Sequence, residues 1–181
     1  GARTIRNFDL SFHGQQTMTQ VLQRSLNTGA AWVSQQLGPD LFYWYVRRFG
    51  FGEPTNSALA GEAAGIAKEP GNLFWAPVDL ATNSFGQGIA VTPLQIVRAF
   101  AAVANGGDLV RPRLVRAVIT ADSVRAVAPV IERQVIRAET AAQLRRMMQA
   151  VVDGVLGHPA QTPGWAVAGK SGTSDVVEGG V

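Results

Sequence analysis

The stretch that most constrains the fold lies near the C-terminal end, where Ala168-Gly169-Lys170-Ser171-Gly172-Thr173 follows the apolar run Trp165–Ala168. It brings a cation, hydroxyl groups and glycines together on one short segment. Lys170 supplies a point charge, Ser171 and Thr173 supply hydroxyl donors, and a glycine lets a ligand approach the backbone closely. An extended segment of this composition suits an anionic ligand.

The same residues also fit a phosphate-binding loop, because Gly164–Ser171 match the pattern G-x-x-x-x-G-K-[ST]. That loop requires a buried strand before its first glycine and a helix that begins around its lysine. Here residues 158–163 are typical of a turn, and residues 172–177 make a poor start for a helix. We therefore expect a strand over about residues 165–177, with the Lys-Ser-Gly-Thr group on one edge, and no ATP or GTP binding.

A second motif, Ser25-Leu26-Asn27, lies in a region with helical character. One class of serine acyl-transfer enzymes carries three elements, S-x-x-K, S-D-N and K-T-G. This chain has S-x-N and K-S-G-T in the same order, with Ser25 and Lys170 about 145 residues apart. Either motif alone is weak, because a Ser-x-Asn triplet is usually a helix cap or a turn. The pair gains weight only from the rest of the chain.

Five further stretches resemble the transpeptidase domain of class B penicillin-binding proteins. They are Val21–Gly29, Phe49–Gly52, Gly61–Gly65, Ser84–Gln95 and Ala104–Gly107. The resemblance runs from about Thr4 to Thr173, nearly the whole chain. It implies an α+β fold with helices packed on an antiparallel sheet, as in serine β-lactamases and DD-peptidases. On this basis residues 1–181 are expected to be a partial transpeptidase domain, incomplete at both ends.

The resemblance also implies an activity and its partners. The parent protein would cross-link peptidoglycan stem peptides ending in D-Ala-D-Ala through a serine acyl-enzyme, would bind β-lactam antibiotics and would need no cofactor. It would act at the extracytoplasmic face of a bacterial membrane, held by an anchor outside this sequence. The other expected partner is the N-terminal part of the same polypeptide.

Residue roles follow from the same resemblance. Ser25 would relay a proton to the leaving amine, and Asn27 would form a hydrogen bond with the side-chain amide of the substrate. Lys170 would support this proton network electrostatically. Ser171 and Thr173, with Gly172 between them, would bind the carboxylate of the stem peptide or of a β-lactam. The family usually has threonine at the position of Ser171, and serine keeps the hydroxyl group.

One family motif is absent from these 181 residues. An S-x-x-K would require serine three residues before Lys68 or Lys170, and those positions hold Gly65 and Val167. We therefore expect the nucleophilic serine upstream of residue 1, and a chain that is inactive alone. Two alternatives stay open: a catalytically silent homologue that acts as a scaffold or sensor, and a serine β-lactamase or DD-carboxypeptidase. The Ser84–Gln95 stretch favours the transpeptidase.

Composition excludes other classes of function. The sequence has no cysteine, so disulfides, zinc–thiolate sites and cysteine nucleophiles are excluded. His13 and His158 lack metal-ligand spacing, so no metal is expected. The net charge of +3 is too small and scattered to indicate nucleic-acid binding. No apolar run approaches the ~20 residues of a membrane span.

Sequence patterns also predict the main elements. Thr17 and Gln20 predict a capping box for a helix with apolar positions Val21, Leu22, Ala30, Val33 and Leu37, which ends at Gly38-Pro39. The other expected elements are an aromatic helix (Leu41–Phe49), a loop region with short helices beside a substrate groove (50–90), a helix capped by Thr92 that buries Leu94, Val97, Ala101 and Val103 or their neighbours, an antiparallel strand pair (Leu109–Thr120 and Val124–Val135), and a helix (Glu139–Val152).

Overall fold

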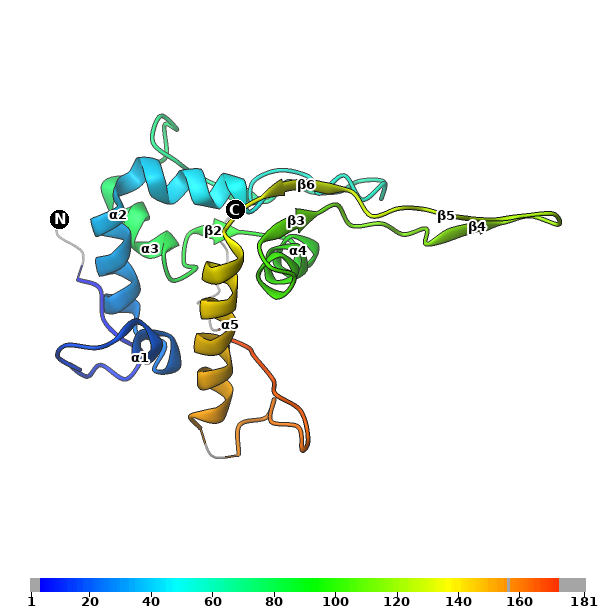
Figure 1. The fold of residues 1–181 in the computed structure, drawn as a ribbon. Coiled ribbons are helices and arrows are strands. Elements are labelled where there is room, and N and C mark those ends of the chain that lie inside the picture. Colours follow the sequence, from blue (N-terminus) through cyan, green and yellow to red (C-terminus); the bar gives the residue numbers. More distant parts are fainter. Residues whose placement is uncertain (1–3, 156, 173–181) are drawn as a thin grey trace. The chain divides into compact units, whose positions relative to one another are not determined.

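The computed structural model describes residues 4–155 and 157–172 (Figure 1). The described helices are α1 (Met18–Gln23), α2 (Asn27–Arg48), α3 (Pro77–Asn83), α4 (Pro93–Ala104) and α5 (Ala138–Asp153). The described strands are β1 (Ile66–Ala67), β2 (Ile89–Ala90), β3 (Asp108–Val110), β4 (Ala117–Ile119), β5 (Val124–Ala126) and β6 (Ile131–Gln134). The chain divides into two compact units: Gly1–Tyr43 with Lys68–Ile89 and Gln143–Val181, and Trp44–Ala67 with Ala90–Ala142.

In the first unit, helix α1 begins as the sequence predicts, with a capping box between Thr17 and Gln20. The helix predicted to run to residue 37 is interrupted, because residues 24–26 separate α1 from α2. Gly29 is a point of close packing between the two helices. A Cβ atom at Gly29 would lie 2.8 Å from both γ-carbons of Val21.

The predicted helix end at Gly38-Pro39 is confirmed. Gly38 has φ 72° and ψ 165°, so α2 consists of two helical segments joined at a kink. In the second segment Tyr43 is 2% exposed and belongs to the core of the first unit. Its hydroxyl accepts hydrogen bonds from Trp75 Nε1 at 2.8 Å and Asn83 Nδ2 at 2.9 Å, which joins α2 to α3.

In the second unit, α4 has the predicted capping box between Thr92 and Gln95. Its buried face differs from the prediction, because Val97 is 62% exposed and Ala101 is also exposed. The side chains that are buried are Gln95, Arg98, Ala99 and Ala102. The apolar pattern failed because this face makes polar contacts, among them an ion pair between Arg98 and Glu132.

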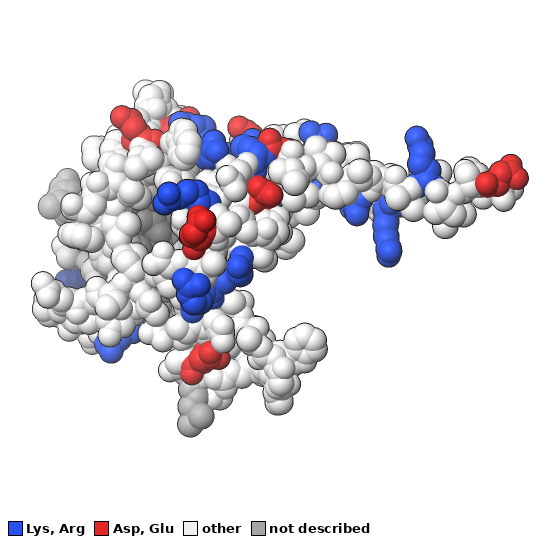
Figure 2. Space-filling model, viewed as in Figure 1, with Lys and Arg blue, Asp and Glu red and all other residues white. Residues whose placement is uncertain are grey.

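The expected antiparallel strand pair is confirmed, with interruptions. β3 pairs with β6 and β4 pairs with β5, and the turn lies at residues 120–123. Pro112 and Pro129 lie in the interrupted parts, where a missing backbone N–H removes a donor from the ladder. Basic side chains project from the extended arm of the molecule in Figure 2. Arg113, Arg116 and Arg125 of the β3–β6 segment are exposed. Ala102, Leu109 and Val135 form the core cluster beside this ribbon.

Helix α5 matches its predicted range to within one residue at each end. The strand expected from Trp165 does not form in the residues described up to Gly172, and positions 173–177 lie outside them. Thr162 and Trp165 make an isolated bridge, and the backbone N–H of Gly169 donates to the carbonyl of Met148 in α5 at 3.2 Å. The segment therefore lies against a helix, which offers it no strand partner. Among the described helices, none has the length and apolar character needed to span a bilayer.

Candidate active site

A serine and a lysine that are distant in sequence meet in the first unit. The Lys170 ammonium group donates to Ser25 Oγ at 2.9 Å. It also lies 3.1 Å from the backbone oxygen and 3.2 Å from the hydroxyl of Ser171. An ammonium group has three protons, so it can serve these three oxygens. The structure thus brings together three of the residues that the two sequence motifs single out.

The bend between α1 and α2 presents Ser25 to this lysine. Ser25 has φ +53°, a left-handed conformation that costs a non-glycine residue about 1–2 kcal/mol. Its N–H donates to the carbonyl of Leu22 at 3.2 Å, and the N–H of Leu26 donates to that of Val21 at 3.0 Å. Leu26 is 4% exposed, so it anchors the bend in the core while Ser25 remains exposed.

Lys170 has an environment suited to proton handling. The side chain is half-buried, and this burial lowers the pKa of Lys170 because it disfavours the charged form. A lysine whose pKa is lowered exchanges a proton more readily near neutral pH. The contact between Lys170 Nζ and Ser25 Oγ gives such a proton a direct path to or from a hydroxyl group.

The other predicted site residues are placed differently. Asn27, the first residue of α2, donates from Nδ2 to the carbonyl of Arg6 at 3.1 Å. This contact with the N-terminal segment was missed by the sequence analysis, because residues 1–16 carry no motif. Gly172 is exposed, with no atom within 4 Å of a Cβ built on it. Thr173 lies outside the described residues, so its predicted role stays a prediction.

A hydrogen bond also joins the bend between α1 and α2 to helix α5. Gln23 donates from Nε2 to the carbonyl of Ala150 at 2.8 Å. A Cβ atom at Gly154 would lie 2.8 Å from Gln23 Nε2 and from the Ala150 oxygen, so α1 and the last turn of α5 are closely packed. The bend that carries Ser25 is therefore fixed to the helix against which the Lys170 segment also lies.

The phosphate-loop interpretation disagrees with the local backbone. Residues 170–172 are not helical, whereas that loop needs a helix around its lysine. Gly164 has φ +80° and lies in the turn between Thr162 and Trp165, not at the end of a strand. The Lys170 side chain is engaged with Ser25 and Ser171.

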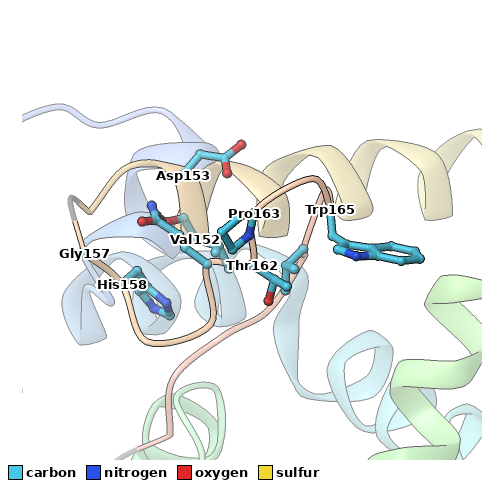
Figure 3. Close-up of a pocket in the computed structure, with 9 residues that line it drawn as sticks. Val152, Asp153, Gly157, His158, Thr162, Pro163 and Trp165 are labelled. Carbon is cyan, nitrogen blue, oxygen red and sulfur yellow. Dashed lines mark hydrogen bonds between the residues drawn. The ribbon is translucent and has the colours of Figure 1, made fainter.

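A cavity of about 590 Å³ lies beside the C-terminal end of α5 (Figure 3). Its walls include Asp153, His158, Thr162, Pro163 and Trp165. The Asp153 carboxylate, the His158 ring and the Trp165 ring do not converge in Figure 3. Over the described part of the chain no group of His, Asp and Glu side chains could hold a metal ion. The cavity therefore lacks the converging acid, base or nucleophile that a catalytic site requires.

Comparison with known proteins adds an independent result. A model of the penicillin binding protein transpeptidase domain matches residues 1–181. Stage V sporulation protein D of Bacillus subtilis is 38% identical over 183 residues, which cover 99% of this chain and 28% of that protein.

Two solved structures are also similar. The D,D-transpeptidase domain of a peptidoglycan glycosyltransferase from Eggerthella lenta superposes with a TM-score of 0.84 and 26% identity, over 98% of this chain and 46% of that one. Penicillin binding protein 3 of Mycobacterium tuberculosis, complexed with ampicillin, has a TM-score of 0.70 and 32% identity, over 84% of this chain and 32% of that one.

Proposed function

Since the chain belongs to the penicillin-binding protein transpeptidase family, we propose that it forms part of a transpeptidase domain that joins peptidoglycan stem peptides through a serine acyl-enzyme. The observation that supports this most is the contact of 2.9 Å between Lys170 Nζ and Ser25 Oγ. The chain spans about a quarter of the curated relative's length, 28% in the case of the sporulation protein. The activity, substrates and location proposed here are those of a longer polypeptide.

The proposed reaction uses Ser25 and Lys170 in proton transfer. The hydroxyl of the S-x-x-K serine attacks the carbonyl carbon of the penultimate D-alanine while the lysine of that motif takes its proton, and the bond to the terminal D-alanine nitrogen breaks. The departing nitrogen needs a proton, which Ser25 donates while it receives one from Lys170. The lowered pKa of Lys170 favours this transfer, because burial has already made the ammonium form less stable. A β-lactam ring opens by the same sequence of steps.

Substrate binding is assigned to the neighbouring polar groups. The Ser171 hydroxyl lies 3.2 Å from Lys170 Nζ, so a charge and a hydroxyl donor are available together for a terminal carboxylate. Thr173 would add a second hydroxyl, and Asn27 would form a hydrogen bond with the side-chain amide of the substrate. We place the nucleophile in an S-x-x-K motif of the longer polypeptide, which would lie at the extracytoplasmic face of the membrane.

The first test uses the 181-residue chain alone. Incubation with penicillin, followed by intact-mass spectrometry, is expected to give no stoichiometric adduct. Ser25 has no lysine at the spacing of S-x-x-K, and Ser171 belongs to the carboxylate site. A stoichiometric mass increase that maps to Ser25 or Ser171 would show that the nucleophile is misassigned.

The second test uses the protein expressed in full from its gene. Ser25→Ala is expected to slow acylation by penicillin by about 100-fold, the usual contribution of a positioned proton donor. Ser34→Ala is the matched control, because Ser34 is 1% exposed in the same unit and its hydroxyl donates to the carbonyl of Ala31 within its own helix. Equal acylation rates for Ser25→Ala and the wild type would refute the proton-transfer role.

A further inference from the structure

The segment before α1 contacts the residues on both sides of Ser25. We propose that Asn7 is a positioning residue, whose buried side chain, together with the Arg6 carbonyl and the His13 ring, holds the α1–α2 bend where Ser25 meets Lys170. We call Arg6, Asn7 and His13 the N-terminal brace. The catalytic meaning of this inference rests on the proposed function, but the positioning itself does not.

Asn7 holds the beginning of α2 from a remote part of the chain. The first N–H groups of a helix have no partner within the helix, so another group must accept from them. Asn7 Oδ1 accepts from both the N–H of Thr28 at 3.1 Å and its hydroxyl at 2.9 Å. Asn7 Nδ2 donates to the carbonyl of Ser11 at 3.0 Å, and the residue is 6% exposed. Both ends of the amide are therefore used, and its orientation is defined.

The rest of the brace contacts the residues next to Thr28 and Ser25. The Arg6 carbonyl accepts from Asn27 Nδ2 at 3.1 Å, which holds the residue that precedes Thr28. Arg24, the residue before Ser25, lies with its Nη1 at 3.1 Å from His13 Nδ1. A guanidinium group can only donate, so His13 Nδ1 is the acceptor.

His13 is itself held by the same segment. With Nδ1 accepting, the imidazole carries its proton on Nε2, and this N–H donates to Asp9 Oδ2 at 2.6 Å. Asp9 Oδ1 in turn accepts from the N–H of Ser11 at 3.0 Å. Ser11 also accepts from Asn7 through its carbonyl, so the parts of the brace support one another. The segment contacts Arg24, Asn27 and Thr28, with Ser25 between them.

The bend needs this support. Helix α1 has six residues, which is too short to be stable by itself in water. Ser25 adopts a left-handed conformation and is exposed, so little packing holds its own side chain. A hydrogen bond to Lys170 requires Ser25 Oγ to be placed within a fraction of an ångström. Loss of the brace would let the bend relax and would expose Lys170 to water.

The test follows Lys170 directly, without substrate. In the protein expressed in full from its gene and labelled with ¹³C at lysine Cε, the signal of Lys170 is the one that Lys170→Arg removes. In Asn7→Ala, the pKa of Lys170 measured from its signal is expected to rise by about half a unit or more, because hydration favours the ammonium form. Thr28→Val, which removes one of the two bonds to Asn7 Oδ1, should raise it by less.

Asn83→Ala is the matched control. Asn83 is 5% exposed in the same unit and donates to the Tyr43 hydroxyl, so its loss also destabilises the fold. It is expected to leave the pKa of Lys170 unchanged. The proposal is overturned if Lys170 in folded Asn7→Ala titrates as in the wild type, or if Asn83→Ala shifts it equally. Should Asn7→Ala not fold, an unchanged pKa in Thr28→Val overturns it.

A failure of the proposed function would look different. The titration of Lys170 involves neither penicillin nor peptidoglycan, so it reports the position of the bend even in a protein without transpeptidase activity. Conversely, acylation that is slowed by Ser25→Ala while Asn7→Ala leaves the pKa of Lys170 unchanged would support the function and refute the brace.

Discussion

Replacement of the buried Gln95 should destabilise the second unit. It is 1% exposed, and its Oε1 accepts from the N–H of Thr92 at 2.9 Å as half of the α4 capping box. Its Nε2 donates to the carbonyls of Glu53 and Ala64, each at 2.8 Å. One amide therefore joins the start of α4 to both ends of the loop at residues 53–64.

Gln95→Leu keeps most of the volume and removes all three bonds. A buried polar group left without a partner costs about 1–3 kcal/mol. Thr92 and Ala64 are half-buried and Glu53 is exposed, so water can satisfy part of the loss. We take about 1 kcal/mol for each partner, which gives a decrease of about 3 kcal/mol in the free energy of unfolding.

Urea unfolding followed by circular dichroism measures this change. With a slope of about 2 kcal/mol per molar urea, the midpoint should fall by about 1.5 M. Gln143→Leu is the control, since Gln143 is exposed on α5 and its replacement should change stability by at most about 0.5 kcal/mol. A decrease below about 1 kcal/mol for Gln95→Leu would refute the role of the three bonds.

Two further predictions concern the same unit. The hydrogen bonds from Thr55 hold the pKa of the Glu62 carboxyl below its usual value. The stability that they contribute is therefore present above the pKa of the unfolded state and is lost as pH falls through the pKa of the folded state. The free energy of unfolding of Glu62→Gln, measured in urea between about pH 6 and pH 3, should depend less on pH than that of the wild type. Gly107 has φ +108°, and a Cβ atom there would lie 2.0 Å from the Ile136 carbonyl oxygen, so Gly107→Ala should lower the free energy of unfolding by about 3 kcal/mol or more. A Cβ atom at Gly106 meets no atom within 4 Å, so Gly106→Ala should cost only about 1 kcal/mol of backbone strain. Equal melting temperatures for these two variants would contradict the second prediction.

The sequence predicts local features well where one short pattern decides them. The capping boxes at Thr17 and Thr92 and the break at Gly38 depend on neighbouring residues alone, and all three are confirmed. The two site motifs were identified in the same way, and the structure places Ser25 and Lys170 in contact. Their catalytic roles remain proposals.

What the sequence could not predict depends on distant contacts. Gln95 and Arg98 are polar, and only the carbonyls and the carboxylate that meet them explain why α4 buries them. Asn7 carries no motif, and its proposed positioning role depends on the hydrogen bond that it accepts from Thr28, which is 21 residues away. The strand expected after Trp165 failed for the same reason, because a strand pattern does not supply the neighbouring strand.

The central claim is that Lys170 takes part in acyl transfer through Ser25. The most direct measurement is the rate of acylation by penicillin of the protein expressed in full, followed by intact-mass spectrometry over time. Lys68→Ala is the matched control, because it removes the other lysine of this chain. We predict a stoichiometric adduct on the serine of an S-x-x-K motif, formed about 100-fold more slowly or worse in Lys170→Ala and at the wild-type rate in Lys68→Ala. Acylation of Lys170→Ala at the wild-type rate would contradict the account.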